Sequence, residues 1–147
     1  MKRQYPARPL VGVGGIVFHR DQVLLIKRKN PPGQGIWSIP GGLVKIGEAL
    51  REAVRREVKE ETNLEVRPEE IIEVVERILP DNEGEIVYHY VIVDFLCAFL
   101  GGEHKPQSDA SDLVWLPFKK LDTLEINEEL KNIIEKAYAL WRQKNDR

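Results

Sequence analysis

The stretch GGLVKIGEALREAVRREVKEETNL, residues 41–64, has the most informative pattern of residues in the chain. It predicts a tight glycine turn and a loop, followed by one helix whose second half carries Glu57, Glu60 and Glu61. At about 100° per residue, the helix has an apolar arc. Its members are Leu50, Ala53, Val54 and Val58. Glu57 and Glu61 fall in the middle of this arc, and Glu60 falls at its edge.

These three acids favour a metal site. Burial of an unpaired carboxylate costs several kcal/mol, so two acids within an apolar arc need a positive partner. Acids spaced i, i+3 and i+4 also repel one another within one helical turn. Hard oxygen ligands suit Mg²⁺ or Mn²⁺. The alternative is a surface helix with many Glu–Lys and Glu–Arg pairs, but such a helix does not normally place two acids at the centre of its apolar arc.

A family resemblance adds to this interpretation. Gly42, Glu48 after five intervening residues, and the run REVKEETNL at residues 56–64 together resemble the Nudix box, GX5EX7REUXEEXGU, in which U is aliphatic. The resemblance covers residues 42–64 closely and most of the chain more loosely. Asn63 stands where the family has a glycine that ends the helix. Because Asn tolerates the left-handed conformation better than most residues, we expect the helix to end there all the same.

The resemblance implies a set of roles within the box. Glu57, Glu60 and Glu61, with the backbone carbonyl of Gly41, are the expected ligands of Mg²⁺ or Mn²⁺. Glu57 is either a ligand or the base that activates water. We expect Arg56 to orient the acids from a position between Glu52 and Glu60.

Further roles lie around the box. Glu48, at the start of the helix, is expected to interact with the helix dipole or with a further metal. In this family a carboxylate from a later loop often serves as an extra ligand or as the base. Asp109 and Asp112, in the polar segment 104–112, are the candidates, and the sequence does not choose between them.

A basic cluster upstream of the box provides candidate substrate contacts. Lys27, Arg28 and Lys29 precede the loop at residues 30–35, NPPGQG, and this cluster could clamp a diphosphate. We name Arg28 and Lys29 as substrate-binding candidates. A charged strand end is the alternative. Trp37 lies where Nudix enzymes often carry an aromatic residue, either packed beneath the loop or stacked on a base.

Composition indicates one compact enzyme domain. The chain has 147 residues, 22 of them basic and 24 acidic, so no basic excess points to nucleic acid or an anionic membrane as a partner. The single Cys97 excludes an internal disulfide and favours a cytoplasmic location. No apolar run reaches membrane-spanning length. We expect one domain over residues 1–147, with residues 1–9 as a loosely held arm.

The hydrophobic pattern predicts an α/β fold. We expect strands at residues 10–18, 23–26, 71–79, 86–100 and 113–116, with residues 65–68 as a connection. Glycines in the first strand indicate a bulge or a close backbone approach. A second amphipathic helix at residues 126–143 begins with Asn127 as its N-cap. The Nudix resemblance implies an α/β/α sandwich, a mixed sheet between helices.

The resemblance also suggests a substrate. A proline about sixteen positions after the box recurs in ADP-ribose pyrophosphatases, and Pro80 occupies that position. The phrase RKNPP before WSIPGG is similar to the same group. We therefore expect a small nucleoside diphosphate derivative, with ADP-ribose cleaved to AMP and ribose 5-phosphate. The alternatives are a nucleoside triphosphate pyrophosphohydrolase that removes modified nucleotides and a non-catalytic nucleotide-sensing module. A homodimer is one alternative for the assembly.

Overall fold

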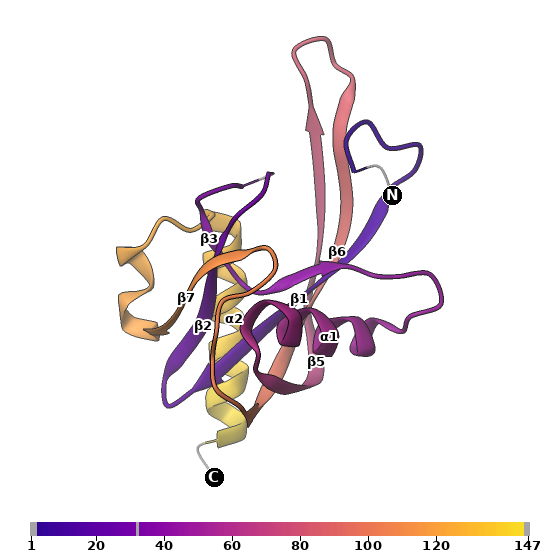
Figure 1. The fold of residues 1–147 in the computed structure, drawn as a ribbon. Coiled ribbons are helices and arrows are strands. Elements are labelled where there is room, and N and C mark those ends of the chain that lie inside the picture. Colours follow the sequence, from indigo (N-terminus) through magenta and orange to yellow (C-terminus); the bar gives the residue numbers. More distant parts are fainter. Residues whose placement is uncertain (1–2, 32, 146–147) are drawn as a thin grey trace.

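The fold is a mixed β-sheet between two helices. The computed structural model describes residues 3–31 and 33–145. Figure 1 shows helix α1 on one face of the sheet and helix α2 on the other. The strands are β1 (Leu10–His19), β2 (Gln22–Arg28), β3 (Trp37–Ser38), β4 (Gly41–Leu43), β5 (Glu65–Pro80), β6 (Ile86–Gly101) and β7 (Ala110–Pro117). The helices are α1 (Leu50–Thr62), the 3₁₀ helix η1 (Phe118–Thr123) and α2 (Glu128–Asn145).

The sheet divides at β1. The strand order is β3-β2-β1-β6-β5, and β1 runs parallel to β6 while the other pairs are antiparallel. On its other edge, β1 pairs with β4 through Gly12, Val13 and Gly14, and with β2 through Phe18 and His19. Two strands therefore leave the same edge of β1. This division opens space near Gly14, between the sheet and the start of α2.

Helix α1 packs through the apolar arc that the sequence predicts. Ala53, Val54 and Val58 are fully buried against the sheet. The helix ends at Asn63, which has φ 66° and ψ 10° and donates its backbone N–H to the Lys59 carbonyl at 2.9 Å. The predicted left-handed ending is thus confirmed, and Asn63 performs there the role of the family's glycine.

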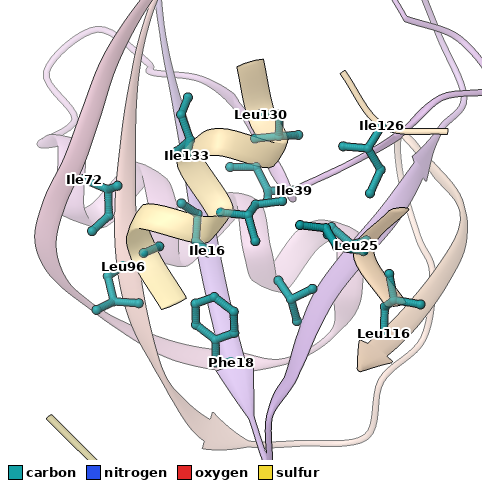
Figure 2. Close-up of a cluster of buried hydrophobic side chains, with 14 of the residues drawn as sticks. Ile16, Phe18, Leu25, Ile39, Ile72, Leu96, Leu116, Ile126, Leu130 and Ile133 are labelled. Carbon is teal, nitrogen blue, oxygen red and sulfur yellow. The ribbon is translucent and has the colours of Figure 1, made fainter. Parts of the chain in front are cut away.

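Helix α2 covers the opposite face. Figure 2 shows Leu130 and Ile133 pointing towards Ile16 and Ile39, within the larger of the two buried apolar clusters. The Asn127 carboxamide oxygen accepts hydrogen bonds from the backbone N–H groups of residues 129 and 130, at 2.9 and 3.3 Å. The predicted N-cap is therefore confirmed.

The connection expected at residues 65–68 is wrong. Strand β5 already begins at Glu65, and Val66 and Pro68 are buried while Glu65 and Arg67 are exposed. That alternation with a period of two is a strand pattern. The charges and the proline hid it, although proline is tolerated here because β5 is an edge strand of the sheet.

Two further boundaries differ from the expectation. Gly41 and Gly42 belong to strand β4 and form no turn, because their missing side chains let β4 lie close to β1. Strand β7 begins at Ala110, so Asp112 lies on a strand and not in a loop. Both short segments lack the apolar alternation from which a strand is normally predicted.

The N-terminal arm follows the hairpin of β5 and β6, which extends beyond the body of the fold in Figure 1. Residues 3–9 form no helix or strand. The Tyr5 backbone N–H donates to the Val87 carbonyl at 2.7 Å, and the Tyr5 hydroxyl donates to the Asp81 carboxylate at 2.9 Å. Residues 1 and 2 of the expected arm lie outside the described residues. Within those residues, neither long helix has the length and apolarity needed to span a membrane.

The end of α1 gives a first prediction. Asn63→Ala should lower the free energy of unfolding by about 1 kcal/mol, because alanine is strained at positive φ. Asn63→Gly is the matched control, since both variants lose the Asn63 side-chain bond to the Glu103 carbonyl but glycine accepts the conformation. Chemical denaturation measures the difference. Equal stability of the two variants would contradict the left-handed ending.

Candidate active site

Glu61 is the most buried acid of the helix. It is 1% exposed, and its carboxylate accepts one hydrogen bond, from the Gly41 backbone N–H at 2.8 Å. Over residues 3–31 and 33–145 no ion pair involves it. Burial raises the pKa of Glu61 to about 8, the Gly41 hydrogen bond opposes this shift, and the nearby Glu57 and Asp109 charges add to it.

Glu57 lies one helical turn earlier, against Gly42. A Cβ atom built on Gly42 would lie 2.7 Å from a Glu57 carboxylate oxygen, so only glycine leaves room for this side chain. Glu57 pairs with Arg56 at 2.7 Å. Burial nevertheless raises the pKa of Glu57, with smaller contributions from Glu60 and Asp109, while Arg56 opposes the shift.

Arg56 binds several of the acids at once. Its Nε and Nη2 atoms donate to the two Glu48 carboxylate oxygens at 2.7 and 2.9 Å, and Nη2 also donates to the Leu43 carbonyl at 3.0 Å. Its Nη1 atom donates to Glu57 at 2.7 Å and to Glu60 at 3.2 Å. This planar, forked geometry suits guanidinium and fixes the direction of each acid.

One expectation around Arg56 needs correction. Its second partner is Glu48 and not Glu52, whose carboxylate instead accepts the Ala49 backbone N–H at 3.3 Å at the start of the helix. The two Arg56 hydrogen bonds lower the pKa of Glu48 to about 2. The wheel could not indicate this pair, because Glu48 precedes the helix and reaches Arg56 through the path of the loop.

Glu60 completes the predicted ligand set from a more exposed position. Its side chain is 44% exposed, and Arg56 is its ion-pair partner. In the part of the chain that the structure describes, no three His, Cys, Asp or Glu side chains are gathered closely enough to hold a metal ion. Arg56 draws Glu57 and Glu60 to itself, whereas Glu61 turns towards Gly41.

The two loop acids have different surroundings. Asp109 contributes to the pKa of both Glu57 and Glu61, so its charge faces the acidic site, and it accepts a hydrogen bond from the Asn30 side chain. Asp112 lies on β7 opposite Lys27, and its carboxylate accepts the backbone N–H of residue 113 at 2.8 Å. Asp109 therefore remains a candidate for the site, whereas the structure does not bring Asp112 to it.

The donor set fits a hard divalent cation. Five carboxylates, those of Glu48, Glu57, Glu60, Glu61 and Asp109, are matched by two guanidinium groups, those of Arg56 and Arg28. The donors are oxygens, as Mg²⁺ and Mn²⁺ prefer. The buried Glu61 carboxylate accepts one hydrogen bond from a neutral donor and forms no ion pair within residues 3–31 and 33–145, although the Arg28 charge acts on it from nearby. A divalent ion would supply the missing positive charge, with Gly41 adjacent to contribute its carbonyl.

A cavity of about 330 Å³ lies behind the glycine strand β4, between the sheet and the start of α2. Arg28 and Trp37 line it, as do Gly41 and Gly42. Lys29 is exposed and does not line it; its backbone N–H donates to the Asp109 carbonyl at 2.8 Å. The cavity and the acids thus share the two glycines as a common wall, and the volume suits a nucleoside-sized group.

Several residues of this region were not among the sequence-based candidates. Tyr90 and Asp94 of β6 and Arg77 of β5 line the cavity. The sequence carried one signal for them: Asp94 is a lone acid inside the apolar run VIVDFLCAF, and a buried acid in such a run calls for a polar partner. Arg77 and Tyr90 gave no such signal, because both residue types are common on exposed strand faces.

Known proteins resemble this chain over most of its length. A family model for the NUDIX domain matches residues 8–137. The ADP-ribose pyrophosphatase of Methanocaldococcus jannaschii is 36% identical over 134 residues, which cover 91% of this chain and 75% of that protein. The 8-oxo-dGDP phosphatase of Homo sapiens is 34% identical over 128 residues, which cover 84% of this chain and 36% of the human protein.

A solved structure agrees with the fold. The MutT NUDIX hydrolase of Burkholderia pseudomallei superposes with a TM-score of 0.72 at 28% identity, over 88% of this chain and 98% of that one. The acids of α1, the mixed sheet between helices and the family match over residues 8–137 lead to one conclusion. The chain belongs to the Nudix hydrolases, a family of pyrophosphohydrolases.

Proposed function

We propose that this protein hydrolyses the diphosphate of a nucleoside diphosphate linked to a second moiety, with Mg²⁺ or Mn²⁺, and that ADP-ribose is its substrate. The products are AMP and ribose 5-phosphate. The observation that carries the proposal is the buried Glu61 carboxylate beside Glu57, which forms no ion pair in the part of the chain that the structure describes. Such an arrangement is costly for stability alone, and it favours a cation that a diphosphate can share.

The residues of the chain provide a scaffold for this reaction. Glu60 and Glu61 would hold the metal with the Gly41 carbonyl, and Glu57 would be either a further ligand or the base. When bound, the metal supplies Lewis-acid stabilisation of the charge on the diphosphate. Arg56 is a positioning residue, because it is anchored by Glu48 and directs Glu57 and Glu60 without needing to contact the substrate.

The hydrolytic step needs a proton acceptor. The oxygen of a water molecule attacks one phosphorus, the bond from that phosphorus to the bridging oxygen breaks, and a carboxylate takes the proton of the water. Glu57 is suited to this because burial raises its pKa towards neutrality, where a base is most effective. Asp109, whose charge faces the same site, is the alternative base.

ADP-ribose is supported by similarity and by the cavity. The archaeal relative is named an ADP-ribose pyrophosphatase. Leu79, next to the Pro80 to which the family resemblance points, lines the cavity behind β4. A nucleoside in this cavity would bring its diphosphate to the acids across the Gly41–Gly42 wall.

A second candidate is the hydrolysis of modified nucleotides such as oxidised nucleoside di- or triphosphates. The human relative, named an 8-oxo-dGDP phosphatase, supports it. The same acids would serve, and the difference would lie in what the cavity accepts. A module that only binds nucleotides is disfavoured because Glu48, Glu57, Glu60 and Glu61 are all retained.

A substrate panel tests the proposal directly. With Mg²⁺ or Mn²⁺, ADP-ribose should be hydrolysed with a higher kcat/KM than nucleotide sugars, oxidised or ordinary dNTPs and dinucleoside polyphosphates. Product analysis should find AMP and ribose 5-phosphate in equal amounts. A clear preference for oxidised nucleotides would instead support the second candidate, hydrolysis of modified nucleotides. If none of these compounds is hydrolysed, both functions are refuted.

Removal of the acids should abolish hydrolysis without unfolding the protein. Glu57→Gln and Glu60→Gln should each lower kcat by about 10²–10⁴-fold, because each removes a carboxylate that would hold the metal or accept the proton of the water. Glu52→Gln is the matched control, an acid of the same helix that faces away from the site, and glutamine preserves its contact with the Ala49 N–H. Full activity of either Glu57→Gln or Glu60→Gln would contradict the proposal.

The negative charge of Glu61 should lower the stability of the fold but be required for hydrolysis. Its folded-state pKa of about 8 lies above the ordinary 4.5, so in the absence of metal the protein should lose stability as the pH rises from about 4.5 to 8. Glu61→Gln retains an acceptor for the Gly41 N–H but no charge. In EDTA at pH 8 it should be more stable than the parent, by up to about 5 kcal/mol, and hydrolysis should be lost.

Denaturant titrations at pH 5 and pH 8 measure this effect. The difference between the variant and the parent should shrink at pH 5, where the unfolded state also begins to hold the proton. Mg²⁺ should stabilise the parent and not the variant at pH 8. A variant less stable than the parent at pH 8 in EDTA would show that the Glu61 charge is not a burden to the fold.

A further inference from the structure

Asp94 is a second buried acid, and the hydrolytic scheme does not use it. It lies on β6, is 4% exposed and faces α2, whereas Glu57 and Glu61 belong to α1 on the other face of the sheet. Among residues 3–31 and 33–145, no hydrogen bond or ion pair reaches its carboxylate. A charge so buried and without partner is rare in folded proteins and calls for an explanation.

Neighbouring charges do not neutralise it. Arg77 of β5 is paired with Glu129 of α2 at 3.0 Å, and Glu73, opposite Asp94 on β5, is paired with Lys136 of α2 at 3.3 Å. Burial raises the pKa of Asp94 to about 7; Arg77 opposes this shift, and Glu129 and Glu73 add to it. Arg77, whose charge acts on Asp94, therefore has another carboxylate as its ion-pair partner.

The fold makes room for this carboxylate. Asp94 lies beside Gly14 in the parallel pair of β1 and β6, and a Cβ atom on Gly14 would collide with an Asp94 carboxylate oxygen and with the Ile39 side chain. A side chain at position 14 would push the acid out of this position. The missing side chain thus preserves both the position of Asp94 and its access to the cavity.

A second buried polar group lines the same cavity. The Tyr90 hydroxyl, four residues before Asp94 on the same face of β6, makes no hydrogen bond of normal geometry in the described part of the chain. Burial raises the pKa of Tyr90, and the nearby Arg3 guanidinium opposes this shift. Much of the remaining wall is apolar and includes Trp37 and Ile92, and arginine side chains, Arg28 among them, line its edge. Flat apolar walls with a few convergent polar groups are typical of sites for planar heterocycles.

We propose that Asp94 selects the nucleobase of the substrate, an inference that rests on the proposed function. Asp94 would do so by accepting a hydrogen bond from the exocyclic amino group of a base held in this cavity. Adenine carries such a group. Gly41 and Gly42 line the cavity and also contact Glu61 and Glu57, so a base at Asp94 and a diphosphate at the acids belong to one ligand. A base without the amino group leaves the buried acceptor unpaired, which costs affinity.

Equilibrium binding of two nucleotides that differ only in this group tests the proposal. The probes are AMP and purine riboside 5′-monophosphate, which lacks the 6-amino group, titrated by calorimetry. The parent should bind AMP about 10–100-fold more tightly, as expected for a hydrogen bond to a charged group. Asp94→Leu should reduce this ratio to within about threefold, through weaker binding of AMP. Asp94→Asn, which retains a carbonyl acceptor, should keep an intermediate ratio.

Glu73→Gln is the matched control, since it removes one carboxylate from the neighbouring strand without lining the cavity. It should leave the ratio unchanged. Asp94→Leu should fold at least as stably as the parent, because it removes a buried charge without partner. Should it fail to fold, the isosteric Asp94→Asn carries the test, with a ratio lower than that of the parent.

The outcomes separate this inference from the proposed function. Equal binding of the two nucleotides by the parent, no binding of either, or an unchanged ratio in the folded Asp94 variants would overturn the role of Asp94. Hydrolysis of ADP-ribose would remain intact in that case. A ratio that depends on Asp94 in a protein that hydrolyses no compound of the panel would support the base site and refute the pyrophosphohydrolase.

Discussion

The hydrogen bond from the Gly41 N–H to the Glu61 carboxylate connects the two halves of the site. It joins α1 to β4, and through β4 to the centre of the sheet at Gly14. One neutral hydrogen bond does not compensate for the burial of a carboxylate. The apolar contacts of Val54 and Val58 hold the helix, and with it Glu61, in this unfavourable place. The packing of α1 therefore holds in place a carboxyl group whose charged form gains no ion pair within the described residues.

Arg56 limits how much repulsion the helix must bear. By donating two hydrogen bonds to Glu48 and by pairing with Glu57 and Glu60 through Nη1, it offsets part of the charge of the outer acids and makes no hydrogen bond to the inner Glu61 in the described part of the chain. The site therefore has a more exposed edge, where the acids pair with Arg56, and a buried centre at Glu61, where no ion pair forms within the described residues. Because a positive charge gains most where water is excluded, the centre is where a cation has its largest effect.

The sequence was sufficient for those parts of the fold that follow from one periodic element. The helical wheel placed Glu61 on the buried side of α1, and the tolerance of asparagine for positive φ explained Asn63. Prediction from the sequence failed where the position of a residue depends on contacts between distant segments. The pair of Glu48 with Arg56 depends on the path of a loop, and the strand character of Gly41 and Gly42 depends on the approach of β1. Neither leaves a local pattern in the sequence.

Asp94 is a further example of what the sequence alone could not predict. The apolar run at residues 86–100 correctly predicts a strand that contains Asp94, but such a run does not tell whether a buried acid meets a cation, a water molecule or a cavity. That depends on the division of the sheet at β1, where β4 and β2 leave one edge and open a space beside Gly14. The same division puts β4 between the cavity and the acids of α1. Glu61 and Asp94 thus lie on opposite faces of one sheet, each beside a glycine backbone, and a single extended ligand can satisfy both.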